Sequence, residues 1–273
     1  MKKSRREFLK NASMVTAFMA SGGLQFISAT ELLSLKNKVK LRFIVASDAH
    51  YGQPDTPFDA MAETFIEKAN LFHSTQPCDF CVLNGDIIHD EAHLMPLAKG
   101  KFDNLEMPLY ATKGNHDQVS DEVWEEIWKI PVNHQFVQDK NAFILVTTSD
   151  EEGTYLSPNL PWLKEKLEEN RKQKNVFLFV HIPQAKWTKY SIDTPEFFEL
   201  LINYPNVKAV FHGHEHEHDD IIMHNNVPFL FDAHIGGSWG TDYKGFRVVE
   251  VMKDNSIITY MMDPVEAFER NTL

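Results

Sequence analysis

The sequence predicts an α/β fold in which a mixed β-sheet is layered with helices and closed by an antiparallel second sheet. Three observations lead to this prediction. The chain has 273 residues, 43% of them apolar, which is enough to bury one sizeable core. Strand and helix patterns alternate as far as residue 211, and strand patterns then follow one another without helices. No internal repeat and no long Gly/Ser linker divides the chain.

The elements follow from local patterns in chain order. The first strand is predicted at 40–46, where the run KLRFIVA is rich in β-branched and aromatic residues. A helix is predicted at 57–73, because apolar residues recur there at helical spacing behind Pro57. The same reasoning gives strands at 79–84, 108–113, 141–147, 175–180 and 207–211, and helices at 91–99, 121–129, 157–172 and 195–203. The closing strands are predicted at 219–224, 227–231, 246–252 and 256–262, with hairpin turns at Asn225-Asn226 and Asp254-Asn255.

The N-terminus has the layout of an export signal. The segment Ser4-Arg5-Arg6-Glu7-Phe8-Leu9-Lys10 precedes an uncharged stretch and resembles the bacterial twin-arginine signal. Glycines and polar residues interrupt that stretch, so no stable membrane span is expected. We therefore expect a signal segment at 1–29 read by the twin-arginine export machinery, a folded domain at 38–263, a tail at 264–273, and a periplasmic or otherwise exported protein. The alternative is a basic, frayed N-terminus.

The net charge bears on possible partners. The chain has 27 basic and 39 acidic residues, for a net charge of −12. Removal of 1–29 takes away five basic residues and one acidic residue, which leaves 22 and 38 and a net charge of −16. Binding of nucleic acid requires a cationic surface that releases counterions. No nucleic-acid polymer is therefore expected as a partner, and a nonspecific nuclease or an anionic-membrane binder is disfavoured.

The cysteines are two. Cys78 and Cys81 form a C-x-x-C that runs into an apolar stretch. Three residues apart on a strand, they point to opposite faces and cannot easily bond each other. Two buried free thiols are the expected state, with a redox pair as the alternative.

The ends of the predicted strands carry the residues that bind metals. The runs end in Asp48-Ala49-His50, Gly85-Asp86, Gly114-Asn115-His116-Asp117, His181-Ile182-Pro183 and His212-Gly213-His214-Glu215-His216. Each motif alone has an ordinary explanation as a turn, a helix cap or a solvated loop, but five in this order are hard to obtain by chance. Ligands at the carboxyl ends of strands converge on one crevice. Two aspartates, one asparagine and four histidines are too many for one tetrahedral ion and suit two ions that share a carboxylate.

These motifs resemble those of the calcineurin-like metallophosphoesterases, whose order is D-x-H, G-D, G-N-H-D/E, H and G-H-x-H. The matches extend from Asp48 to His216. The resemblance implies a four-layer α-β-β-α sandwich of two mixed sheets. The spacing and the context of His181 look most like the cyclic-nucleotide phosphodiesterase and purple-acid-phosphatase-like branch.

The resemblance also implies a dinuclear centre of divalent or mixed-valence ions such as Mn, Fe or Zn, with Asp86 as the bridge. The ligands of one ion would be Asp48, His50 and His216. The ligands of the other would be Asn115, His181 and His214. Purple acid phosphatases have a ligating tyrosine three residues after the bridging aspartate, and here that position is His89, so an Fe(III)–tyrosinate centre is in doubt.

The implied activity is hydrolysis of small phosphomonoesters or phosphodiesters by in-line attack of a metal-bridging hydroxide. His116 would protonate the leaving oxygen or stabilise the transition-state charge, and Asp117 would orient it. A metal-binding exported protein without turnover and a nuclease are the alternatives. The further imidazoles His212, His218 and His234 are not expected as ligands. Trp239 either stacks on a substrate base or covers the core.

Overall fold

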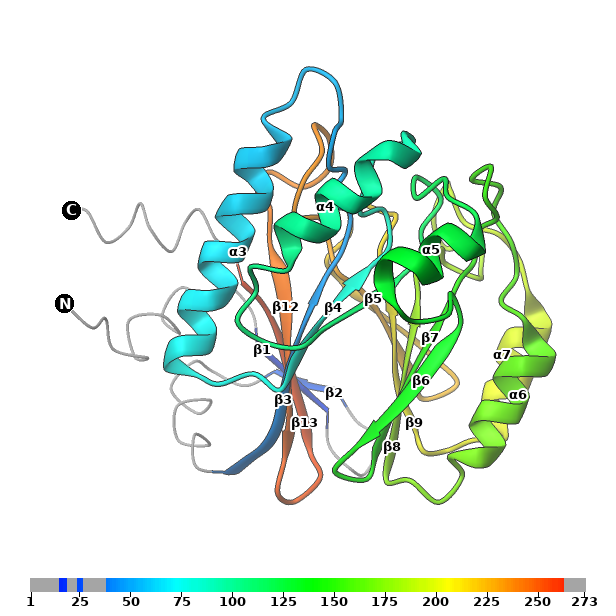
Figure 1. The fold of residues 1–273 in the computed structure, drawn as a ribbon. Helices are drawn as coiled ribbons and strands as arrows, with labels where there is room; N and C mark the ends of the chain where they lie inside the picture. Colours follow the sequence, from blue (N-terminus) through cyan, green and yellow to red (C-terminus); the bar gives the residue numbers. More distant parts are fainter. Residues whose placement is uncertain (1–14, 19–23, 27–37, 263–273) are drawn as a thin grey trace.

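A computed structural model of the chain describes residues 15–18, 24–26 and 38–262 and contains two β-sheets packed face to face (Figure 1). The seven-stranded sheet has the order β2-β1-β13-β12-β3-β4-β5 and the six-stranded sheet the order β10-β11-β9-β8-β7-β6. The strands of the first sheet are β1 (Val15–Phe18), β2 (Leu24–Phe26), β3 (Val39–Ala46), β4 (Phe80–Asn84), β5 (Leu109–Thr112), β12 (Phe246–Met252) and β13 (Ile257–Met262). Those of the second are β6 (His134–Gln138), β7 (Asn141–Val146), β8 (Asn175–Val180), β9 (Val207–His212), β10 (Ile221–His224) and β11 (Val227–Phe231).

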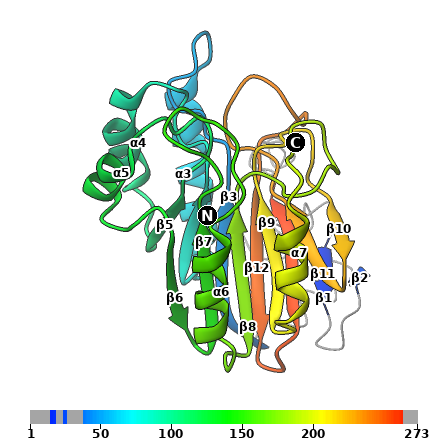
Figure 2. The same ribbon diagram turned by 90° about the vertical axis from the view of Figure 1, so that its right-hand side faces the viewer.

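Each sheet contains a block of parallel strands. β3, β4 and β5 pair in parallel in one sheet, and β7, β8 and β9 do so in the other. Figure 2 shows the loops that follow these strands gathered at one end of the molecule. The loops after these six parallel strands therefore meet at one edge of the sandwich.

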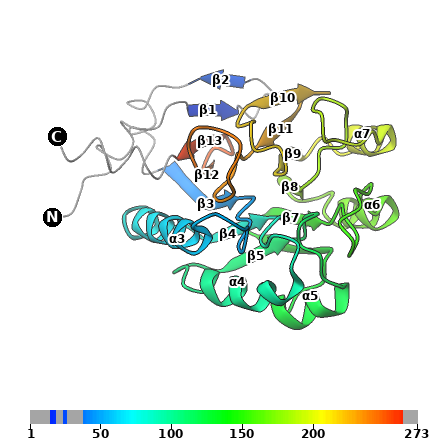
Figure 3. The same cartoon turned by 90° about the horizontal axis from the view of Figure 1, so that it is seen from above.

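Helices cover the two outer faces. α3 (Phe58–Thr75), α4 (Met95–Phe102) and α5 (Asp121–Trp128) pack on the seven-stranded sheet, and α6 (Leu160–Glu169) and α7 (Pro195–Ile202) pack on the six-stranded sheet (Figures 2 and 3). A 3₁₀ turn, η2 (Ala92–Leu94), leads into α4. The four-layer α-β-β-α sandwich is thus confirmed.

Aromatic side chains fill the space between the sheets. Phe43 of β3 lies 5.0 Å from Phe80 of the same sheet and 5.4 Å from Phe143 and Phe177 of the other, ring centre to ring centre. All four rings are buried. Each buried phenyl ring contributes about 1.5–3 kcal/mol to stability, so this cluster holds the two sheets in a fixed relation.

Three details of the predicted fold are wrong. The last four strands do not form an antiparallel sheet of their own: β10 and β11 join the six-stranded sheet, where β11 runs parallel to β9, and β12 and β13 join the other sheet beside β3. The predicted helix 91–99 is a 3₁₀ turn followed by α4. The predicted helix 157–172 begins only at Leu160, because the Asn159 side chain accepts the backbone N–H of Trp162 and caps it.

The predicted signal segment 1–29 lies mostly outside the described residues, as does the tail 264–273. Within that segment, β2 pairs with β1, and β1 pairs antiparallel with β13. No helix within residues 38–262 is long and apolar enough to cross a membrane. Export stays a prediction.

The two thiols are free and buried, as predicted. The expectation that both cysteines lie on one strand and point to opposite faces is wrong. Cys78 precedes β4 and packs in the same apolar cluster as Cys81. Burial raises the pKa of the Cys78 thiol to about 12, so it stays protonated at neutral pH.

Candidate metal centre

The loops after five strands carry the seven predicted ligands, and six of these lie together in two groups of side chains. Asp48 and His50 follow β3, Asp86 follows β4, and Asn115 follows β5. The remaining three come from the other sheet: His181 follows β8, and His214 and His216 follow β9. The site therefore lies between the carboxyl ends of both sheets.

The first group of ligands consists of Asp48, His50 and His216. Their nearest ligand atoms all lie within 4.8 Å of one another, and all three side chains are buried. His216 Nε2 is 3.2 Å from Asp48 Oδ1 and 3.0 Å from His50 Nε2. Two imidazole nitrogens and a carboxylate oxygen that face one another at this spacing suit a shared cation.

The second group consists of Asp86, His181 and His214, again within 4.8 Å. His181 Nε2 is 3.2 Å from Asp86 Oδ2. The same carboxylate oxygen lies 3.8 Å from His50 Nε2 in the first group, so Asp86 stands between the two groups, as a bridging ligand must. The buried Oδ1 of Asn115 has no hydrogen-bond partner among the described residues, which fits an oxygen reserved for a cation.

The local backbone directs these side chains into the crevice. Asp48, His50, Asp86 and His214 all have positive φ, between 44° and 69°. This conformation is unfavourable for residues other than glycine and persists where the surrounding structure imposes it, typically at functional sites. Gly85 has φ of 86°, and a Cβ there would overlap the His181 ring. The glycine before Asp86 thus allows the two strand ends to approach.

Backbone carbonyls fix the orientation of three ligand rings. The Nδ1–H of His181 donates to the Asn84 carbonyl at 2.6 Å, and the Nδ1–H of His216 donates to the Trp239 carbonyl at 3.1 Å. His214 is turned the other way, with its Nε2–H donating to the Tyr190 carbonyl at 3.0 Å. In each ring the other nitrogen is left for the site, which is the usual arrangement of metal-binding histidines.

The electrostatics of the crevice favour a cation. Burial opposes ionisation of Asp48, but the neighbouring His216 and His181 lower the pKa of its carboxyl to about 2. Burial likewise opposes a charge on His181, but Asp86 and Asp48 raise its pKa to about 9. Burial lowers the pKa of His50 to about 3, so its ring is neutral. The donor set of carboxylates, an amide oxygen and imidazoles therefore fits a pair of transition-metal ions.

Metal uptake is expected to release a proton from His181. Because the pKa of His181 is raised to about 9 from 6.5, the metal-free ring is protonated at pH 7 and must lose its proton to bind an ion. Calorimetric titration with Mn²⁺ in buffers of different ionisation enthalpy should show proton release at pH 7, in which His181 contributes about one proton that disappears above pH ~10.

A matched pair of variants isolates this proton. His181→Asn should lower the release per bound ion by about one proton, while His216, whose pKa Asp48 also raises, can still contribute. His134→Asn should not lower the release, because burial lowers the pKa of His134 to about 4 and its ring is already neutral. Equal proton release in wild type and His181→Asn would contradict the assignment.

His116 lies beside the ligands without belonging to either group. Its Nδ1 is 2.6 Å from Asp90 Oδ1, and its side chain is 28% exposed. The prediction that Asp117 orients His116 is wrong. The buried carboxylate of Asp117 accepts the backbone N–H groups of Ile87, Ile88 and Gly114 instead. Asp90 was not predicted from the sequence as the partner of His116. Its position four residues after Asp86 could have indicated that it lies near the site.

The other imidazoles have separate environments. His212 donates Nδ1–H to the Val180 carbonyl and lies against Phe229 and Phe231, and His218 lies 3.4 Å from Asp220. Neither belongs to a group of possible ligands among the described residues.

The ring of His216 is held between two aromatic rings. His234 lies 4.7 Å from it, and Trp239 lies 4.4 Å from it with an interplanar angle of 3°. Trp239 keeps 42% of its surface exposed at the edge of the site. It therefore lies against a ligand ring rather than over the apolar core.

Comparison with known proteins agrees with this geometry. The family model of the calcineurin-like phosphoesterases matches residues 41–218. A dimetal phosphatase from Danio rerio has a TM-score of 0.62 at 12% identity, covering 82% of this chain and 99% of that chain. GAP50, described as the anchor in the inner membrane complex of Plasmodium, has a TM-score of 0.61 at 17% identity, covering 84% and 86%. The calcineurin-like phosphoesterase YfkN from Bacillus subtilis has a TM-score of 0.52 at 12% identity, covering 84% and 92%.

No curated protein matches the sequence. The solved structures share the fold at low identity, whereas the family model spans well over half of the chain and all seven predicted ligands. The chain belongs to the calcineurin-like phosphoesterase family.

Proposed function

We propose that this protein is a dinuclear-metal phosphoesterase that hydrolyses small phosphomonoesters or phosphodiesters. The observation that carries the proposal is the position of Asp86, whose Oδ2 lies 3.2 Å from His181 of one ligand group and 3.8 Å from His50 of the other. The backbone N–H of His116 donates to the other oxygen of Asp86 at 2.8 Å, which orients the carboxylate between the groups.

Two cations bound here would lower the pKa of a water molecule and offset the charge on the phosphoryl oxygens. The chain itself supplies the proton for the leaving group. Asp90 accepts the Nδ1–H of His116, so the Nε2 of that ring is the atom that delivers a proton. The Gln118 side chain also donates to Asp90 Oδ1, at 3.0 Å, and holds the carboxylate in place.

Two aromatic side chains border the site and support a small substrate. Trp239 is 42% exposed beside His216, and Tyr190 is 51% exposed beside His214. Exposed rings on both sides of a dinuclear centre suit an organic group attached to the phosphate. The acidic net charge argues against a long polyanion.

The alternative is a protein that binds metal without turnover. GAP50, which is described as an anchor, has a similar fold, so the fold alone does not distinguish an enzyme from a protein without turnover. The pair formed by His116 and Asp90 favours the enzyme, because a pure binder has no use for a proton donor beside its ligands.

The test is an assay of the purified protein loaded with Mn²⁺ or Fe²⁺ against p-nitrophenyl phosphate and bis-p-nitrophenyl phosphate. Metal-dependent turnover of at least one ester is expected, and the ratio of the two rates separates monoesterase from diesterase. The chelator-treated protein is the control. Two bound equivalents of metal with no turnover of either ester would point to the non-catalytic alternative.

We further propose that the protein is exported through the twin-arginine pathway to the periplasm or the cell exterior. Support comes from the order Ser4-Arg5-Arg6-Glu7-Phe8-Leu9. Changing Arg5 and Arg6 to lysine should leave active protein in the cytoplasm, as measured by cell fractionation. Changing Lys2 and Lys3 to arginine keeps both the charge and the pair and should not affect export. Normal export of the Arg5/Arg6 variant would exclude this pathway.

A further inference from the structure

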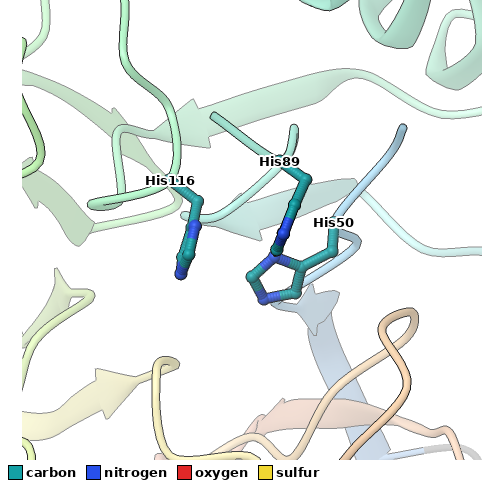
Figure 4. A group of neighbouring side chains, drawn as sticks. All are labelled: His50, His89 and His116. Carbon is teal, nitrogen blue, oxygen red and sulfur yellow. The ribbon is translucent and has the colours of Figure 1, made fainter. Parts of the chain in front are cut away.

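His89 is a histidine beside the metal centre that the proposed function does not use. It follows the bridging Asp86 by three residues, and its side chain is 18% exposed. One nitrogen each of His50, His89 and His116 lies within 4.8 Å of the others. Figure 4 shows the three rings side by side, projecting from separate loops.

The proton of His50 needs an acceptor. The Nε2 of this ring faces the first ligand group, 3.0 Å from His216 Nε2 and 3.9 Å from Asp48 Oδ1. A neutral imidazole carries one N–H, so a ring that gives Nε2 to a metal has its proton on Nδ1. In His181 and His216 the corresponding proton goes to a backbone carbonyl.

In His50 the Nδ1–H faces a side chain instead of a backbone carbonyl. The hydrogen-bond partner of His50 Nδ1 within the described part of the chain is His89 Nδ1, at 3.0 Å. We infer that His89 accepts the Nδ1–H of His50 and so acts as the positioning residue for this ligand, not as a ligand itself. The inference rests on the metal centre of the proposed function but not on turnover.

Asp90 favours the tautomer of His89 that can accept. Its Oδ2 lies 3.9 Å from His89 Nε2, which is too long for a hydrogen bond but favours a proton on that nitrogen and a lone pair on Nδ1. Its Oδ1 meanwhile accepts the Nδ1–H of His116. One carboxylate thus orients His116 directly and His50 through His89.

The ring of His89 has a second contact. It stacks on the ring of His116 at 4.9 Å with an interplanar angle of 8°. A substitution that keeps an aromatic ring but removes the nitrogen therefore separates the acceptor from the stack. A substitution that keeps an acceptor without a ring does the reverse.

Mn²⁺ binding to the full chain, followed by electron paramagnetic resonance of the free ion, is the first measurement. His89→Phe should weaken one of the two sites by ~10–100-fold, the usual cost of losing the outer partner of a metal-binding histidine, and leave the other site unchanged. His89→Gln, whose amide oxygen can accept the proton, should restore most of that affinity. His93→Phe is the matched control, because the side chain of His93 is 71% exposed and lies beside Glu91.

Nitrogen NMR of histidine-labelled wild-type protein is the second measurement, and it requires neither a variant nor a metal. In the metal-free protein His50 should carry its proton on Nδ1 and His89 on Nε2. If the protein took up no Mn²⁺, the proposed function would fail, but the tautomers would still decide the role of His89.

Four results would overturn the inference. One is a proton on His89 Nδ1 in the NMR spectra. Another is a His89→Phe variant that binds both ions normally, or a His89→Gln variant as weak as His89→Phe. The last is a third equivalent of metal in the wild type that His89→Phe loses, which would make His89 a ligand.

Discussion

Replacing Asp86 with asparagine is expected to remove metal and hydrolysis together. The side chain stands between the two ligand groups, with Oδ2 near both His181 and His50. An amide removes the negative charge that both cations share. The loss of metal affinity should exceed the ~10–100-fold that removal of an outer hydrogen-bond partner costs. Elemental analysis after dialysis, alongside the nitrophenyl ester assay, measures both effects.

Asp90→Asn is the control for this experiment. Asp90 lies four residues further along the same loop and contacts His116 rather than the ligands. It acts on His50 only indirectly, through His89. Asp90→Asn should therefore lose activity but at most the ~10–100-fold in metal affinity that an outer partner contributes, which is less than the loss in Asp86→Asn. Two full equivalents in Asp86→Asn would show that this carboxylate does not bridge.

Replacing His116 with asparagine should preserve the metals and lower kcat by ~10²–10⁴, the contribution of a positioned general acid. The ring belongs to neither ligand group of the proposed dinuclear centre, and its Nδ1 is held by Asp90 at 2.6 Å. The loss should be largest for esters with poor leaving groups, which need a proton, and smallest for nitrophenyl esters. Rates for a series of leaving groups measure this dependence.

The slope of that series distinguishes two roles for His116. A steeper dependence on leaving-group pKa in His116→Asn than in wild type identifies the proton donor. An equal loss across the series would instead mean that His116 stabilises charge on the phosphoryl group. A loss of metal in this variant would contradict both roles.

The grouping of the predicted ligands was predictable because it depends on local order. Buried parallel strands are continuous apolar runs in the sequence. Each predicted ligand follows the end of such a run, as Asp86 follows β4 and His181 follows β8. The positions of these ends in one crevice then follow from the parallel pairing of the strands.

The rest depends on contacts that sequence order does not reveal. β12 lies between β13, which follows it in the sequence, and β3, which is some 200 positions away. A local pattern could therefore identify the strand but not its sheet. β6 was missed because its residues are mostly polar and half-exposed. Asp117 is the nearest carboxylate to His116 in sequence, but three backbone N–H groups occupy it, which leaves the role to Asp90.

The buried thiol of Cys81 allows local unfolding of the seven-stranded sheet to be measured. Its strand, β4, lies between β3 and β5 and carries Asp86 at its end, and the side chain is 0% exposed. Burial raises the pKa of this thiol well above its ordinary value, so a thiol reagent can modify it only during excursions that separate the strands. The rate of modification therefore reports how often this part of the sheet opens, and any ion that binds only the closed form must slow it.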